Sequence, residues 1–228
     1  MRNGIEGFES GTSTLPTASE RTRHPTLPTD KEIVAKIKAV GVRHIVEVPC
    51  SITDTIHQLW EQEARDGNLT LITTSNEHAL SGIAAGIHAG TNKTALIHMQ
   101  NSGLTNAGDG IISFADEGVY NIPMIALVTW RGNSPKDDSE PHQAIGKRTS
   151  HLSRSIMGKR GKIYGTHSGR RILRAIEGAA QTAQEGKMAM ILLSPEAFTK
   201  ETTLELPEEV LIFDPREHMR MVAKYQET

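Results

Sequence analysis

The sequence is poor in the features that mark several large classes of protein. Cys50 is the one cysteine among 228 residues, which excludes an internal disulfide and a thiolate cluster of the kind that structural zinc requires. Apolar runs such as Met188–Leu193 fall far below the roughly 20 residues needed to span a bilayer, and the first thirty residues lack the apolar core of a signal peptide. These absences predict a cytoplasmic protein.

The chain also lacks a strong charge of either sign. Its formal net charge is -2 and its pI is about 6.6, so no basic field would draw the whole protein onto nucleic acid or an anionic membrane. Its partners should therefore be small molecules or other proteins.

Composition divides the chain into three parts. Residues 1–28 are rich in Ser, Thr, Pro, Gly and charge, and we expect a disordered leader there because so few large apolar groups cannot offset the entropy of folding. Residues 29–206 should form one domain, which begins with a helix N-cap at Thr29-Asp30. Residues 207–228 are polar, with a small apolar anchor, and form a C-terminal tail.

Short β-branched runs alternate with helical stretches through the predicted domain. This alternation predicts an α/β fold with a doubly wound, mostly parallel sheet. We expect strands at 44–48, 69–73, 94–98, 124–129 and 188–193, and helices at 52–65, 76–90, 104–118 and 168–185.

Ligands bind such sheets beyond the carboxyl ends of the strands, and the residues there are distinctive. Glu77 opens a helix rich in Ala and Gly, in which Gly82 and Gly86 would let another backbone or a flat ring approach closely. A carboxylate at this position could instead only stabilise the positive end of the helix dipole. Further polar groups follow other strands, in Pro49-Cys50-Ser51, Gln100-Asn101-Ser102-Gly103 and Trp130-Arg131-Gly132.

The order of these motifs over residues 30–200 resembles the pyrimidine domain of the phosphonopyruvate and sulfopyruvate decarboxylases, which use thiamine diphosphate. The motifs are Val48-Pro-Cys-Ser51, Asn76-Glu-His-Ala79 with Ala84-Ala-Gly86, Met99-Gln-Asn-Ser-Gly-Leu-Thr-Asn106, Ile122-Pro123 and Trp130-Arg-Gly132. The resemblance implies that Glu77 hydrogen-bonds to N1' of the aminopyrimidine and favours the imino form of that ring. Such a carboxyl must be positioned, desolvated and able to share a proton.

The resemblance also implies roles for the other strand-end residues. Gln100, Asn101, Ser102 and Gly103 would bind the cofactor, although Asn, Ser and Gly are also ordinary turn formers. Ser51, Asn101 and Arg131 would bind the substrate, with Ser51 alternatively a helix N-cap. His142 aligns with the family histidine if one residue is deleted, and would then handle protons; otherwise it is a surface loop histidine.

No protein metal site is expected from the sequence. Gly108-Asp109-Gly110 imitates the motif with which thiamine enzymes hold magnesium and diphosphate, but it does not follow a buried strand. Nothing after residue 207 is long enough to form a diphosphate-binding domain. We therefore expect a partner β subunit to supply the Mg²⁺ ligands, in an α2β2 or larger assembly.

The predicted reaction converts 3-phosphonopyruvate to phosphonoacetaldehyde and carbon dioxide. Decarboxylation of 3-sulfopyruvate is the alternative within the enzyme class, and a non-catalytic regulatory subunit on the same fold is the alternative outside it. A nucleotide-binding α/β protein is the weakest option, because the sequence lacks both a P-loop and a Gly-rich phosphate fingerprint after the first predicted strand.

Overall fold

A parallel sheet of six strands forms the centre of the protein in the computed structural model, which describes residues 27–133, 138–166 and 171–202. The sheet order is β2-β1-β3-β4-β6-β5, so the predicted doubly wound α/β fold is confirmed. The strands are β1 (His44–Glu47), β2 (Thr70–Thr73), β3 (Leu96–Gln100), β4 (Ile125–Thr129), β5 (Lys162–Thr166) and β6 (Ala189–Leu193). Every residue of the central strands β4 and β6 is buried, as expected for strands covered on both faces.

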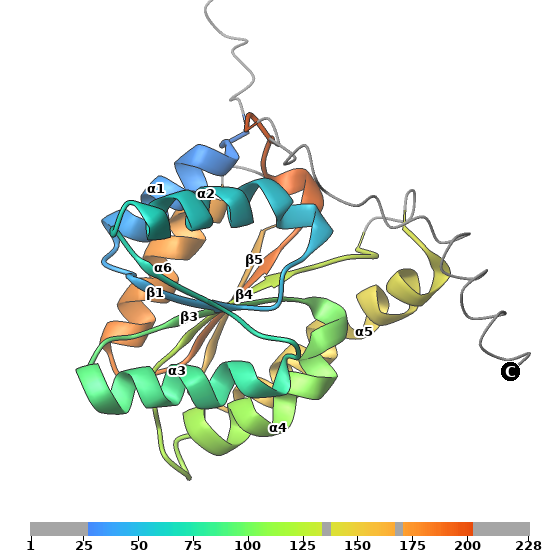
Figure 1. Ribbon diagram of the computed structural model, residues 1–228. Helices are drawn as coiled ribbons and strands as arrows, with labels where there is room; N and C mark the ends of the chain where they lie inside the picture. Colours follow the sequence, from blue (N-terminus) through green and yellow to red (C-terminus); the bar gives the residue numbers. More distant parts are fainter. Residues whose placement is uncertain (1–26, 134–137, 167–170, 203–228) are drawn as a thin grey trace, which may run out of the picture.

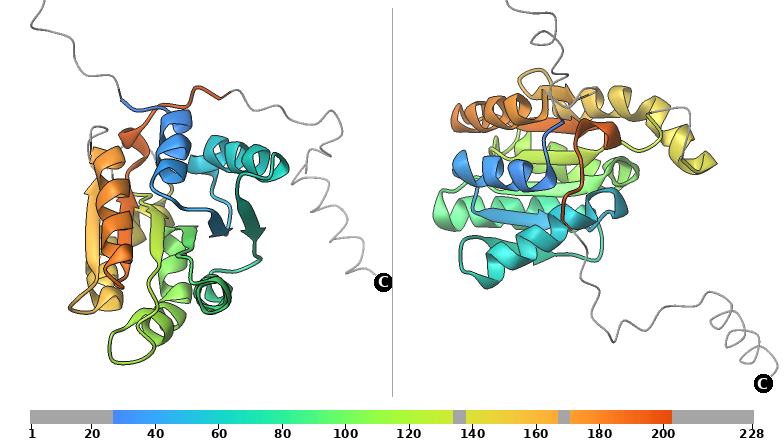
Figure 2. Two further views of the ribbon diagram at one scale, coloured as in Figure 1. Left: turned by 90° about the vertical axis from the view of Figure 1, so that its left-hand side faces the viewer. Right: turned by 90° about the horizontal axis from the view of Figure 1, so that it is seen from above.

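Helices cover both faces of the sheet (Figures 1 and 2). One face carries α1 (Asp30–Ala39), α2 (Asp54–Arg65) and α6 (Ile172–Gln184). The other carries α3 (His78–Thr91), α4 (Leu104–Ala115) and α5 (Glu140–Met157). Each layer buries its own apolar cluster against the sheet, around Trp60 and Ile33 on the first face and around Leu104 and Met99 on the second.

The first helix begins where the sequence predicts. The Thr29 side chain accepts a hydrogen bond from the backbone of Glu32, and the Glu32 carboxylate accepts one from the backbone of Thr29, which completes a capping box. The ordered domain begins one residue before the predicted start at Thr29, because the carbonyl of Pro28 accepts a hydrogen bond from the amide of Thr199 at 3.0 Å. The leader predicted for residues 1–28 lies outside the described residues apart from Leu27 and Pro28, and the predicted tail, 207–228, lies wholly outside them.

Two elements, β5 and α5, were not predicted from the sequence. β5 is an edge strand that contains Gly165, and Thr166 is its one buried residue, so it lacks the apolar run that marks the central strands. The start of α5 contains Pro141, and proline is typical of loops. Proline is nevertheless compatible with the first turn of a helix, because the backbone N–H groups of that turn donate no hydrogen bond within the helix.

Gly108-Asp109-Gly110 lies inside α4, as predicted, and its glycines serve packing. A methyl group on Gly110 would collide with the hydroxyl of Ser81 on α3, and one on Gly108 would lie 3.3 Å from Ile156 on α5. The two glycines therefore allow α4 to pack closely against its neighbours.

The direction of winding reverses between β1 and β3. The chain passes from β1 outward to β2 and then returns to β3 on the other side of β1. The turns that follow β1 and β3 therefore lie side by side at the carboxyl edge, which is the usual ligand position in open α/β sheets. None of the helices in the described ranges is long and apolar enough to cross a membrane.

Candidate active site

Glu77 is the N-cap residue of α3, but its side chain does not cap that helix. No hydrogen bond joins its carboxylate to the first turn, and the amide of Ala79 is instead bound by the side chain of Asn76 at 3.3 Å. Glu77 therefore lies at the positive end of the α3 dipole without forming a capping hydrogen bond.

The Glu77 side chain lies against the turn that follows β3. Its Oε2 accepts a hydrogen bond from Nδ2 of Asn106 at 3.1 Å. A methyl group on Gly103 would lie 2.5 Å from Cγ and 2.6 Å from Oε1 of Glu77, so the absence of a side chain at Gly103 makes room for the carboxyl group. Glu77 is half-buried, and the structure thus holds one positioned carboxyl group at the edge of α3 and α4.

The last residue of β3, Gln100, and the turn Asn101–Gly103 that follows it carry two kinds of polar group. Within the described part of the chain, the side chains of Gln100 and Ser102 make no hydrogen bond, and both are half-buried. Asn101 is fully buried and its amide binds the protein itself: Nδ2 donates to the carbonyl of Arg131 at 2.9 Å and to the hydroxyl of Thr149 at 2.8 Å. Its Oδ1 accepts from the amide of Arg131 at 3.2 Å. Asn101 thus ties the β3 turn to the end of β4.

The residues Trp130-Arg131-Gly132 follow β4 and are here named the Arg131 turn. They contact α5 and hold it against the sheet. The indole nitrogen of Trp130 donates to the carbonyl of Gly146 at 2.9 Å. Gly132 has a φ of 66°, which favours glycine, and a methyl group there would collide with the backbone carbonyl of His142. The motif that the sequence analysis assigned to substrate binding therefore also has a packing function.

The Arg131 guanidinium forms a two-pronged ion pair with Asp138, from Nε at 3.0 Å and from Nη2 at 2.8 Å. This hydrogen bonding outweighs partial burial and lowers the pKa of the Asp138 carboxyl. Both side chains line a cavity of about 130 Å³ at the carboxyl edge of the sheet, whose other walls come from Ile52, Gly132, Asn133, Pro195 and Glu196. The cavity therefore brings the ends of β1, β4 and β6 together around a fixed guanidinium group.

Ser51 and His142 are not among the residues that line this cavity, but each is next to a lining residue or in contact with one: Ser51 precedes Ile52, and the backbone of His142 lies against Gly132. Ser51 is exposed and begins the short 3-10 turn Ser51–Thr53. This turn and the preceding Cys50 are here named the Ser51 turn. The Ser51 side chain does not cap a helix, so the alternative of an N-cap is wrong. His142 lies in the first turn of α5 rather than in a loop, and is half-buried.

The predicted site residues form two groups. Glu77 and Gly103 are in contact between α3 and the start of α4. Asn101 and His142 both contact the Arg131 turn, the first through the backbone of Arg131 and the second through Gly132. Among the described residues no hydrogen bond or ion pair joins Glu77 to Ser51, Arg131 or His142. The first group suits a heterocycle with a ring nitrogen, and the second suits a small anion.

A buried polar network that was not predicted from the sequence lies beneath this edge. Glu47 on β1 is fully buried, and its carboxylate accepts from Nδ1 of His57 and, at 3.2 Å, from Nδ1 of His98. Burial acts to raise the pKa of Glu47, but these two hydrogen bonds outweigh it and lower the pKa to about 2. A glutamate flanked by Ile45, Val46 and Val48 in a predicted strand is the signal that could have identified this network.

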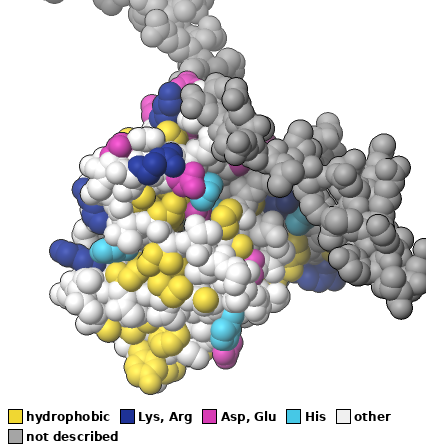
Figure 3. Space-filling model, viewed as in Figure 1, with side chains coloured by type: hydrophobic (Ala, Val, Ile, Leu, Met, Phe, Trp, Pro, Cys, Tyr) yellow, Lys and Arg dark blue, Asp and Glu magenta, His cyan; other side chains and the backbone are white. Residues whose placement is uncertain are grey.

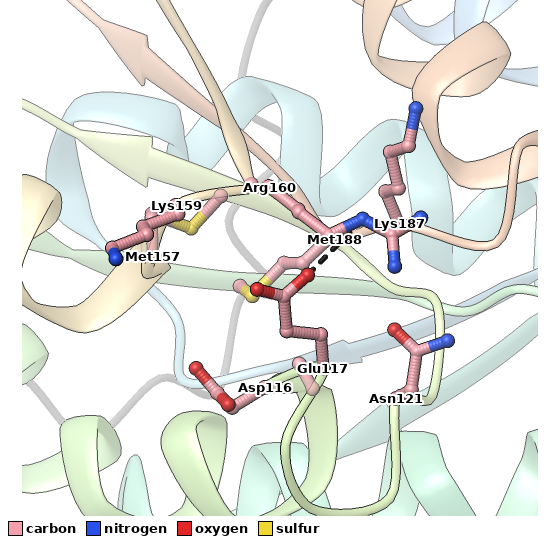
Figure 4. Close-up of a pocket in the computed structure, with 10 residues that line it drawn as sticks. Asp116, Glu117, Asn121, Met157, Lys159, Arg160, Lys187 and Met188 are labelled. Atoms are coloured by element: carbon pink, nitrogen blue, oxygen red, sulfur yellow. Dashed lines mark ion pairs between the residues drawn. The ribbon is translucent and has the colours of Figure 1, made fainter.

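A second hollow lies at the opposite, amino edge of the sheet (Figure 4). It encloses only about 10 Å³, and Arg160 on its rim is paired with Glu117 at 3.1 Å. Lys187 is likewise paired with Glu185 outside the rim. Among the described residues, no group of three or more His, Cys, Asp or Glu side chains could hold a metal ion.

Three comparisons with known proteins bear on this site. The family described as "Thiamine pyrophosphate enzyme, N-terminal TPP binding domain" matches residues 29–152, more than half of the chain. Phosphonopyruvate decarboxylases of Streptomyces viridochromogenes and Streptomyces hygroscopicus are 30% and 29% identical over 122 residues, which cover 53% of this chain and 29% of each relative. The chain thus spans less than a third of the length of these relatives.

The fold has a relative among solved structures. A 2-oxoglutarate:ferredoxin oxidoreductase from Magnetococcus marinus matches 79% of this chain and 33% of that chain, with a TM-score of 0.53 and 12% identity. This likeness supports the sheet order and the layers described above. The region of the family match includes Glu77, Gly103 and the Arg131 turn. The chain therefore belongs to the thiamine pyrophosphate enzymes and carries their N-terminal TPP-binding domain.

Proposed function

We propose that this chain is the pyrimidine-binding subunit of a thiamine-diphosphate-dependent decarboxylase that converts 3-phosphonopyruvate to phosphonoacetaldehyde and carbon dioxide. The observation that carries the proposal is the Glu77 carboxyl group, which is held by Asn106 and accommodated by Gly103 without capping its own helix. The family match supports the cofactor, and the two phosphonopyruvate decarboxylases support the reaction class.

The polar groups near Glu77 fit an aminopyrimidine ring. Its carboxyl group would share a proton with a ring nitrogen, and the side chains of Gln100 and Ser102 offer an amide and a hydroxyl to the edge of the same ring. When bound, the cofactor would supply the carbon nucleophile that attacks the 2-oxo group of the substrate. Glu77 remains half-exposed in this chain, which leaves its carboxyl group accessible from the outer surface.

The substrate would bind in the cavity lined by Arg131. A guanidinium group offers paired donors to a phosphonate, a sulfonate or a carboxylate, and the Asn101 amide fixes the backbone that carries it. Asp138 keeps that group oriented when no substrate is bound. Ser51 and His142 would complete the substrate side, the first as a hydroxyl group and the second as a proton carrier.

We propose that a second chain, which binds the diphosphate group and Mg²⁺, covers α3 and α4 in an α2β2 or larger assembly. Hydrophobic side chains gather over these helices on the face shown in Figure 3. Outside the local backbone of α3, no described atom lies within 4 Å of the position that a methyl group on Gly86 or Gly90 would take. These glycines are not required by packing within the described chain, so a close partner would explain them.

The test is reconstitution of the chain with a candidate partner that contains a diphosphate-binding domain. Binding of thiamine diphosphate and release of carbon dioxide would be measured with 3-phosphonopyruvate, 3-sulfopyruvate and pyruvate. We expect Glu77→Gln to retain assembly and to reduce turnover by about 10²- to 10⁴-fold, the usual contribution of a positioned proton-transfer group. Glu177→Gln, on α6, is the matched control and should retain full turnover.

Each result has a distinct meaning. Faster turnover of 3-sulfopyruvate than of 3-phosphonopyruvate would select the alternative substrate. A complex that binds no thiamine diphosphate would indicate a non-catalytic regulatory subunit. Turnover by Glu77→Gln equal to that of the parent enzyme would refute the assigned role of Glu77.

A further inference from the structure

Glu47 and His98 face one another across the point where the winding of the sheet reverses. They are register partners on the adjacent strands β1 and β3, and both are fully buried. Because an ionised carboxylate only accepts hydrogen bonds, the Nδ1 of His98 that faces Glu47 at 3.2 Å must carry a proton. The carboxylate therefore fixes the tautomer at this end of the ring.

The opposite end of the same imidazole contacts the Ser51 turn and the end of β4, which leads into the Arg131 turn. Nε2 of His98 lies 3.0 Å from the hydroxyl of Thr53 and 3.4 Å from that of Thr129. Thr53 closes the Ser51 turn, and the carbonyl of Cys50, 3.3 Å from the same hydroxyl, is a second acceptor for its one proton. Thr129 is the last residue of β4 and directly precedes the Arg131 turn. One ring thus connects the turn of Ser51 to the turn of Arg131.

The orientation of the His98 ring is fixed from a third side. Trp60 on α2 packs edge-on against it, with ring centroids 5.3 Å apart and an interplanar angle of 75°. His57, also on α2, binds the other oxygen of the Glu47 carboxylate and is partly accessible to solvent. Buried charged groups are costly, and a pair of apolar residues would fill the same space more cheaply. The cost of this network favours a function beyond filling the core.

We propose that Glu47 and His98 are positioning residues of the active site: Glu47 orients the His98 ring, and His98 holds the Ser51 turn and the Arg131 turn at a fixed separation. The catalytic consequence rests on the proposed function, but the mechanical link between the turns does not. Substrate contacts would come from Ser51 and Arg131, and His98 would act through them.

Hydrogen exchange on the full chain tests the link without any activity. Protection would be measured at the amides of Thr53 and Arg131, which form hydrogen bonds to Cys50 and to Asn101. The side-chain amide of asparagine extends about as far as Nδ1 of histidine, so His98→Asn should lose the contacts that Nε2 makes with Thr53 and Thr129. The side-chain amide of glutamine extends about as far as Nε2 and can replace those contacts. We expect His98→Asn to reduce protection at both turns by about threefold to tenfold, as for loss of one ordinary hydrogen bond, and His98→Gln to restore most of it.

Two further variants keep the test decisive if His98→Asn folds poorly. Thr53→Val and Thr129→Val are close in shape to the parent residues and remove one hydroxyl each, and we expect each to loosen mainly its own turn. Thr182→Val is the control, because Thr182 is equally buried and binds Tyr164 at 2.8 Å, between α6 and β5. Unchanged protection in His98→Asn and both threonine variants would overturn the proposal. So would equal losses in His98→Asn and His98→Gln, or in His98→Asn and Thr182→Val.

Kinetics of the reconstituted enzyme give a second readout. If His98 positions substrate-binding turns, His98→Asn should raise KM for the 2-oxo acid more than it lowers kcat, with partial rescue by His98→Gln. An equal KM in parent and variant would contradict positioning. An inactive parent complex would count against the proposed function, while the exchange measurements would still decide the role of His98.

Discussion

The side chain of Glu77 lies so close to the backbone of Gly103 that a methyl group on Gly103 would be 2.5 Å from Cγ of Glu77. The two residues follow different strands, β2 and β3, and meet only because the sheet brings the carboxyl ends of its strands to one edge. We therefore expect Gly103→Ala to displace the carboxyl group. Thiamine diphosphate affinity of the reconstituted complex should fall at least tenfold, measured by calorimetry.

Gly82→Ala is the control for that prediction. A methyl group on Gly82 would lie 3.7 Å from Phe114, which is an ordinary contact. Gly82→Ala should therefore retain cofactor affinity. Equal affinities in the Gly103→Ala complex and the parent complex would show that Glu77 does not depend on this close approach.

Gly86→Ala should separate the stability of the chain from its assembly. Because no described atom outside the local backbone of α3 lies within 4 Å of the added methyl group, the isolated chain should be stabilised by about 0.5 to 1 kcal/mol, the usual gain for alanine over glycine in a helix. If a partner packs closely on α3, the same variant should weaken assembly. Thermal unfolding and sedimentation would measure the two effects, and unimpaired assembly would exclude close partner contact at Gly86.

Arg131→Lys should weaken substrate binding although it keeps the positive charge. Lysine cannot reproduce the two-pronged pair with Asp138, and it presents a single ammonium group to the cavity. We expect KM for 3-phosphonopyruvate to rise about tenfold or more, as for loss of a charge-assisted hydrogen bond. Arg65→Lys, at an exposed position on α2, should leave KM unchanged. An unaltered KM in Arg131→Lys would remove Arg131 from the substrate site.

The Glu47 network should stabilise the fold most strongly in mildly acidic solution. Glu47 has a lowered pKa, so its contribution is present above its ordinary value of 4.5 and is lost as the pH falls toward about 2. His57 has a pKa raised by the Glu47 hydrogen bond despite partial burial, so its contribution is present below 6.5 and is lost as the pH rises through the raised pKa. The two windows overlap between 4.5 and 6.5.

Glu47→Gln should remove this dependence on pH. At about pH 5.5, the lowered pKa of Glu47 contributes roughly 3 kcal/mol to the unfolding free energy of the parent chain, and Glu47→Gln lacks this contribution. The difference in unfolding free energy between parent and variant should therefore be smaller at about pH 3 than at about pH 5.5. Urea unfolding at several pH values would measure it, with Glu177→Gln as the exposed control. A constant difference between parent and Glu47→Gln across this range would contradict the network as described.

The sequence predicted the fold because most strands here are buried on both faces. Runs such as those of β4 and β6 are apolar throughout, and their alternation with helices specifies a parallel, doubly wound sheet. β5 gave no such signal, because an edge strand with one buried residue needs little apolar sequence. The start of α5 was hidden by Pro141, which is compatible with either a loop or a helix start.

The candidate site was predictable in part. The strand-end positions of Glu77, Asn101 and Arg131 followed from the fold, but their partners did not, because Asn106 and Asp138 are selected by three-dimensional packing. The burial of Asn101 against Thr149 likewise depends on α5, which the sequence analysis did not contain. The pairing of Glu47 with His98 required the register of β1 and β3, which no local pattern specifies.

The most direct test of the central claim is a structure of the assembled complex with thiamine diphosphate bound. We predict that the Glu77 carboxyl group lies within hydrogen-bond distance of the ring nitrogen N1' of the pyrimidine, with Gly103 beneath it. A complex in which Glu77 faces solvent, and in which the pyrimidine ring lies elsewhere, would contradict the proposed function.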